Sequence, residues 1–127
     1  MATEAITLVQ LDRSSAPDED ADLYYDVEFQ NGQEAENLWF GLQTHNVPAG
    51  CQIWFHNLDG DLAIAIPPTT VTQNNFTVGT LVGGVPANYT CTIRVFLQLN
   101  GHPLPPDATV ELVVYLAQLI GSATLRS

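Results

Sequence analysis

The chain has 127 residues, enough to bury one hydrophobic core and too few for two ordinary domains, so we expect one domain over residues 1–127. The net charge of −11, with three arginines and no lysine, argues against nucleic acids and anionic membranes as partners, because both are bound through Lys and Arg. No apolar run approaches the roughly 20 residues of a membrane-spanning helix, and Glu4 stands where a signal peptide would be basic, so no signal peptide is visible.

Segments with the pattern of β-strands follow one another along the whole chain. In residues 23–29 the apolar side chains alternate with polar ones, and residues 89–97 show the same period of two. The remaining candidates are rich in β-branched or aromatic residues and are bounded by Gly, Pro, Asn or Asp. The predicted strands are 5–11, 23–29, 37–45, 51–57, 61–66, 75–82, 89–97 and 109–119.

Turn residues separate these segments. Asp59-Gly60 is a strong hairpin signal, and Asn31-Gly32 and Asn100-Gly101 mark further reversals. Pro67-Pro68 cannot donate to a strand ladder, which predicts a loop or a sheet edge at that point. No segment has a helical period that could cover a parallel sheet, so we expect a single antiparallel β-sandwich of about eight strands, Greek-key, Ig-like or jelly-roll.

Catalytic and metal-binding patterns are weak. His45, His56 and His102 lack a nucleophile motif beside them, so we predict no catalytic residues, no cofactor and no enzyme activity. Cys51 and His56, with His45 upstream, match a copper site poorly. Three alternate acidic residues have the spacing of a calcium loop, but Leu23 replaces its glycine, so they are weak calcium candidates or else a solvated acidic loop. These three residues are Asp18, Asp20 and Asp22.

Aromatic and sulfur-containing side chains are the other candidates. Trp39 and Trp54 are either core or interface residues or flat platforms for sugar rings, so a carbohydrate remains an alternative ligand. Cys51 and Cys91 both lie in predicted strands and are either buried free thiols or one disulfide.

One segment resembles a known superfamily. In the stretch from Val85 to Val95, Tyr89 lies two residues before Cys91, and this spacing is similar to the tyrosine corner of immunoglobulin-like domains. The resemblance implies a β-sandwich in which Tyr89, Cys91 and Cys51 have structural roles. Cys51 departs from the antibody pattern, because Trp54 follows it on the same predicted strand. Domains of this kind, similar in size and low charge, occur in phage decoration and tail proteins and in surface filament subunits.

The distribution of charge is the most informative functional feature. Residues 1–36 contain ten acidic residues and one arginine, whereas residues 37–127 contain four acidic residues and two arginines. An isolated sandwich needs charged faces and edges to avoid sticking to its neighbours, so we infer that other protein covers much of this surface. We therefore expect a structural subunit that packs as a homo-oligomer or on a scaffold, in a virion or an extracellular assembly.

Overall fold

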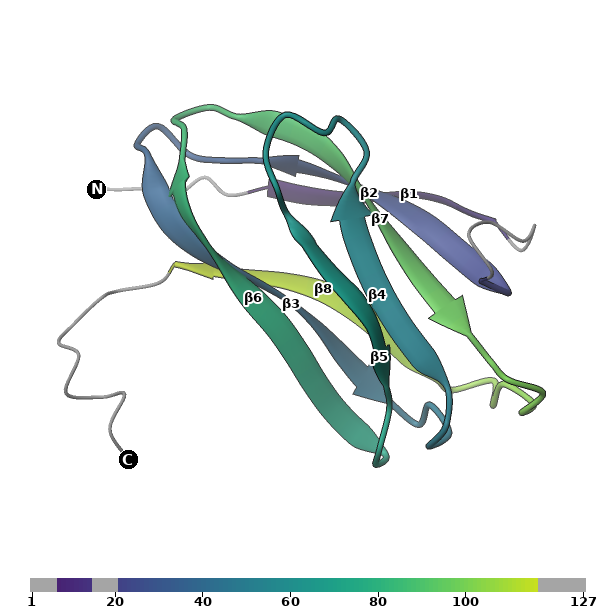
Figure 1. Cartoon of the computed structure of the whole chain (residues 1–127). Coiled ribbons are helices and arrows are strands. Elements are labelled where there is room, and N and C mark those ends of the chain that lie inside the picture. Colours follow the sequence, from purple (N-terminus) through teal and green to yellow (C-terminus); the bar gives the residue numbers. More distant parts are fainter. Residues whose placement is uncertain (1–6, 15–20, 117–127) are drawn as a thin grey trace, which may run out of the picture.

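The structure, a computed structural model, describes residues 7–14 by their backbone and residues 21–116 with their side chains. Eight strands and no helix occur in these residues (Figure 1). The strands are β1 (Thr7–Ser14), β2 (Leu23–Gln30), β3 (Glu36–His45), β4 (Gln52–Asn57), β5 (Ala65–Thr70), β6 (Asn75–Val85), β7 (Thr90–Gln98) and β8 (Thr109–Leu116).

The strands form two sheets in which neighbours are antiparallel. The five-stranded sheet has the order β1-β2-β7-β4-β5, and the three-stranded sheet has the order β6-β3-β8. The prediction of an antiparallel all-β sandwich is therefore confirmed. Greek-key connectivity, of the Ig-like or jelly-roll kind, stays a prediction.

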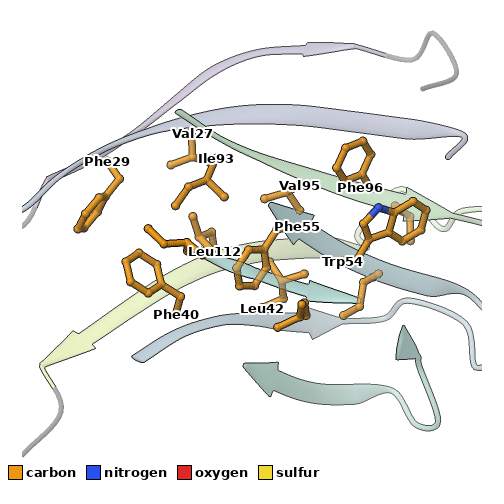
Figure 2. Close-up of a cluster of buried hydrophobic side chains, with 14 of the residues drawn as sticks. Val27, Phe29, Phe40, Leu42, Trp54, Phe55, Ile93, Val95, Phe96 and Leu112 are labelled. Atoms are coloured by element: carbon orange, nitrogen blue, oxygen red, sulfur yellow. The ribbon is translucent and has the colours of Figure 1, made fainter. Parts of the chain in front are cut away.

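The core lies between the two sheets and consists of the inward side chains of each strand. In β3 the residues at even positions, Leu38, Phe40 and Leu42, are fully buried, as the period of a half-buried strand requires. Phe40 meets Phe29 of β2 edge to face at 5.1 Å between ring centroids, so aromatic rings join the two sheets (Figure 2). Full burial of a Phe or Leu side chain contributes about 1.5–3 kcal/mol to folding, which makes these positions the main source of stability.

The fifth strand differs in position from its prediction. The sequence predicts a strand at 61–66, whereas β5 covers Ala65–Thr70 and includes Pro67 and Pro68. The two prolines lie opposite the single residue Trp54 at a break in register, which is a β-bulge at the sheet edge. An edge strand tolerates proline because its missing N–H can face away from the ladder, so the prolines do not end this strand.

Asn31 closes one end of the sandwich. Its side chain is 1% exposed, and its Nδ2 donates to the main-chain carbonyls of Glu34, Val85 and Pro86 at 2.9–3.2 Å. These bonds tie the turn between β2 and β3 to the end of β6. The reversal predicted at Asn31-Gly32 is thus also a contact between distant segments.

The two sheets differ in width, and the difference leaves one side of the sandwich open. β5 and β6 lie against each other at one side, while on the other side β8 faces β2, where the Tyr25 hydroxyl donates to the Val110 carbonyl at 2.5 Å. β1 continues the five-stranded sheet beyond β2. Among the described residues, the three-stranded sheet has no strand opposite β1.

Candidate binding surface on the three-stranded sheet

The outer face of the three-stranded sheet carries Tyr115, the most exposed aromatic side chain of the described residues. Since the even positions of β3 point into the core, Trp39, Gly41 and Gln43 point outward. The pairing register places Leu81 and Tyr115 on either side of Trp39. We call this surface the aromatic face; its residues are Trp39, Gly41, Gln43, Thr77, Gly79, Leu81, Glu111, Val113 and Tyr115.

Trp39 lies flat on the aromatic face because two glycines leave room for its ring. A β-carbon on Gly41 would come within 2.2 Å of the Trp39 indole, and one on Gly79 would come within 2.3 Å of it. The Tyr115 ring runs nearly parallel to the indole, with 5.7 Å between centroids and 15° between planes. Gln43 Nε2 donates to the Tyr115 hydroxyl at 3.2 Å, which places an amide beside the two rings.

The aromatic face is nearly uncharged and partly open to solvent. Leu81 is 51% exposed and Tyr115 is 50% exposed, although both are large. Glu111 is the only charged residue among those of the aromatic face. A face of this kind is suited to contact with another surface, because little charge must be desolvated to cover it.

The outer face of the five-stranded sheet is different in charge. Asp26 and Arg94 form an ion pair there, with 2.7 Å between Asp26 Oδ1 and Arg94 Nε. The Arg94 guanidinium also lies 4.3 Å from the centroid of the Tyr24 ring, and Glu28 is exposed on the same side of β2. Covering these charged side chains would require their desolvation, so this face is a poorer candidate for association than the aromatic face.

Trp54, the second candidate for a sugar platform, is buried. It is 6% exposed and stacks on Phe96 at 5.1 Å with 9° between the ring planes (Figure 2). Phe96 is itself fully buried between this ring and those of Tyr24 and His56. The structure therefore supports the core alternative for Trp54, because Phe96 covers one face of its ring and only 6% of the side chain is exposed. Trp39 keeps an exposed part and remains the candidate.

Tyr89 is held by polar groups from the loop between β4 and β5. Its hydroxyl donates to Asp61 Oδ1 at 2.5 Å and accepts from Asn57 Nδ2 at 2.9 Å. Burial, and then the hydrogen bond to Asp61, raise the pKa of the Tyr89 hydroxyl. Tyr89 thus has a structural role. Its hydrogen-bond partners are two side chains, one at the end of β4 and one in the β4–β5 loop.

Asp59 and Gly60 stabilise the same loop. The Asp59 carboxylate accepts from the Thr92 backbone N–H at 3.2 Å, and its own N–H donates to Asn57 Oδ1 at 2.9 Å. Gly60 has a φ of 76°, a conformation that favours glycine. The turn predicted at Asp59-Gly60 connects the antiparallel strands β4 and β5.

Cys51 and Cys91 are both buried free thiols. Cys51 Sγ contacts the Leu99 carbonyl at 3.6 Å. Cys91 lies at the start of β7 and Leu99 just after its end. At ~3.3 Å per strand residue, the two ends are about 25 Å apart. A disulfide needs Cα atoms within about 7 Å, so the structure leaves no route to a bridge between them. Burial, and then the negative charge of Asp59, raise the pKa of Cys91 to about 11.

Among the described residues, the other metal and catalytic candidates do not form a cluster of three or more. Asp18 and Asp20 lie outside the described residues, and the Asp22 carboxylate accepts from the Leu99 backbone N–H at 2.7 Å. His45 bonds Asn75 at the end of β3, His56 lies beside Phe96, and His102 is in the loop after β7. No group of three or more His, Cys, Asp or Glu side chains with metal-binding geometry occurs in the part of the chain that the structure describes.

Most residues of the aromatic face could not be identified from the sequence. The alternation of Trp39 and Gly41 along one strand places both on the same side, and this signal is present in the sequence. Gly79 and Tyr115 lie beside Trp39 only because of the register in which β6 and β8 pair with β3. This register cannot be read from the local sequence pattern.

Within the described residues no helix is long and apolar enough to cross a membrane. No protein-family model, curated protein or solved structure matches the chain, so the aromatic face is identified by its geometry alone.

Proposed function

We propose that the protein is a non-enzymatic structural subunit that associates with further copies of itself through the aromatic face. The observation that carries this proposal is a surface with two stacked aromatic rings and a single carboxylate, in a chain with a net charge of −11. The partner surface is the aromatic face of a second copy, which is the arrangement of a two-fold symmetric contact.

Charge supports a second copy as the partner. Two chains of the same strongly negative charge repel each other through most surfaces. The aromatic face presents only Glu111, so two copies that meet there bury apolar rings and bring few like charges together. Covering Leu81 and Tyr115 would also remove from water the large apolar side chains that are most exposed in the described residues.

Sedimentation velocity over a range of protein concentrations tests the proposal. The wild type is expected to show a concentration-dependent increase in mean sedimentation coefficient. Leu81→Glu places a carboxylate on the aromatic face and should leave a monomer. Leu58→Glu is the matched control, because Leu58 is 41% exposed in the β4–β5 loop and should not affect association. A wild type that stays monomeric at the highest concentration contradicts the proposal.

The same contact would allow the subunit to join a larger particle, such as a viral capsid, a tail or a surface filament. This part of the proposal is supported by the small size of the chain and by the low charge of residues 37–127. Under this proposal the protein belongs to a virion or an extracellular assembly. Electron microscopy of the purified protein at high concentration is the direct test, and the absence of any ordered particle would count against it.

Carbohydrate binding is the second candidate function, and the geometry of Trp39 favours it. The indole lies flat over Gly41 and Gly79 beside the parallel ring of Tyr115, and the Gln43 amide is adjacent. Flat aromatic surfaces with a few polar groups beside them suit the apolar faces of sugar rings. A glycan array combined with quenching of tryptophan fluorescence tests this function, and Trp39→Ala should abolish quenching while the buried Trp54 still emits. A lack of response to every glycan would remove this candidate.

A further inference from the structure

The open side of the sandwich exposes side chains that point toward the core. Val110 and Val114 of β8 and Leu23 and Tyr25 of β2 all face inward by strand alternation, yet each is only half-buried. On the interior strand β7, by contrast, Ile93 and Val95 are at most 1% exposed. The difference arises because no strand covers the space beside β8 in the described residues.

This space is a groove between the two sheets. Its volume is about 570 Å³, and both sheets line it, with Leu23 and Val27 from β2 and Val110 and Leu112 from β8. Leu104 and Ala108, from the loop that precedes β8, close one end. The groove shares Glu111 with the aromatic face, but its other lining residues lie outside that face, so an inference about the groove is tested independently of the proposed self-association.

We propose that the groove binds an extended peptide segment of a partner protein, which adds to the edge of β8 as a fourth strand of the three-stranded sheet. The segment has apolar side chains at alternate positions, which enter the groove, and basic residues at its ends. Binding of this kind is β-augmentation, in which main-chain hydrogen bonds supply affinity and alternate side chains supply specificity.

The edge of β8 has the features that strand addition requires. Its eight residues, TVELVVYL, contain no proline or glycine and one charge, and all are paired in register with β3. Protected edge strands carry prolines, bulges or several charges, and β5 with Pro67 and Pro68 is such an edge. The Val110 carbonyl accepts a hydrogen bond from the Tyr25 hydroxyl, so an added strand replaces this donor at Val110.

Two kinds of partner could pair with the edge of β8, a single peptide segment or the sheet of a second sandwich. The unequal widths of the two sheets favour the single segment. The five-stranded sheet extends past β8 through β1, so a second sandwich that paired its own sheet with β8 would meet this overhang. A single strand, about 4.8 Å wide, needs only the position opposite β1, which no strand of the three-stranded sheet occupies in the described residues.

The charges near the groove favour a basic segment. Glu111 lies on the groove, and Asp22 lines an adjoining hollow that shares Leu23 and Leu104 with it. Arg94 is turned to the outer face of the five-stranded sheet, where it pairs with Asp26, and His102 is the only basic side chain among the described residues that line these two hollows. A segment with lysines at its ends is therefore attracted, and one with glutamates is repelled.

The test uses a synthetic peptide of about ten residues with alternating valine and threonine and a lysine at each end. Its binding to the full chain is measured by isothermal titration calorimetry. We expect saturable binding at one site per chain, weaker binding when glutamates replace the lysines, and increased protection of β8 amides from hydrogen exchange. Methylation of two peptide N–H groups removes about 1 kcal/mol each and should weaken binding about 30-fold.

Variants place the site on the groove. Ala108→Trp fills the groove and should abolish binding, whereas Ala87→Trp, at an exposed position in the loop between β6 and β7, should leave it unchanged. Leu104→Asp tests the same groove independently if Ala108→Trp does not fold, as judged by circular dichroism. The proposal is overturned if the lysine-flanked peptide does not bind, if the N-methylated peptide binds equally well, or if both tryptophan variants bind like the wild type.

Discussion

The Tyr89 hydroxyl links the loop before β7 to the end of β4 and the β4–β5 loop, so its removal should destabilise the fold by a predictable amount. Tyr89→Phe deletes the bond to the Asp61 carboxylate and the bond from Asn57 Nδ2. Asp61 is exposed and can regain water, and Asn57 Nδ2 keeps its bond to the Leu62 carbonyl at 3.0 Å, so neither partner is left fully unsatisfied. The loss of two hydrogen bonds of about 1 kcal/mol each predicts that the free energy of unfolding falls by about 2 kcal/mol.

Urea denaturation measures this loss directly. With a slope of about 1.5 kcal/mol per M, a loss of about 2 kcal/mol lowers the midpoint by about 1.3 M. Tyr115→Phe is the control, because the hydrogen bond of the Tyr115 hydroxyl to the Gln43 amide is exposed to solvent and its loss should cost under about 0.5 kcal/mol. If Tyr89→Phe unfolds within about 0.5 kcal/mol of the wild type, the Tyr89 contacts do not stabilise the loop as described.

The same variant has an expected dependence on pH. The pKa of Tyr89 is raised in the folded state, so its contribution to stability is complete below the unfolded pKa of about 10 and declines as the pH rises above that value. The difference in unfolding free energy between the wild type and Tyr89→Phe should therefore shrink above pH ~10. A difference that grows with pH would show that the folded state prefers the ionised hydroxyl.

Three other predictions follow from local geometry. Cys51 and Cys91 are buried with raised pKa values, so neither should react with a thiol reagent at pH 8 until the chain unfolds, and rapid labelling of native protein would contradict their placement. Gly79→Ala should lower the free energy of unfolding by about 1–3 kcal/mol, and by more than Gly41→Ala does. The new β-carbon at position 79 would lie 2.5 Å from the Phe40 backbone oxygen, whereas the one at position 41 meets only the Trp39 indole, which can move. Thermal melts of both variants test this order. Asn31→Ala leaves three carbonyls without their donor and should cost about 2–3 kcal/mol in urea denaturation, and a neutral effect would mean that water replaces the amide.

The sequence by itself determined the strand content of this protein. Alternation of apolar and polar residues in 23–29 and 89–97 is a local property of an extended chain with one buried face, and it places β2 and β7 within one or two residues. The same reasoning predicts that Trp39 and Gly41 share a face. The charge asymmetry between residues 1–36 and 37–127 can likewise be counted without a structure.

The tertiary structure decided which candidates can reach another molecule. Trp39 and Trp54 are equivalent in local pattern, but Phe96 stacks on Trp54, while two glycines hold Trp39 flat at the surface. Pro67 lies within a strand because β5 is at an edge, and the groove beside β8 exists because one sheet is narrower than the other. Strand order and register come from contacts between residues far apart in the chain, so a pattern that repeats every two residues carries no information about them.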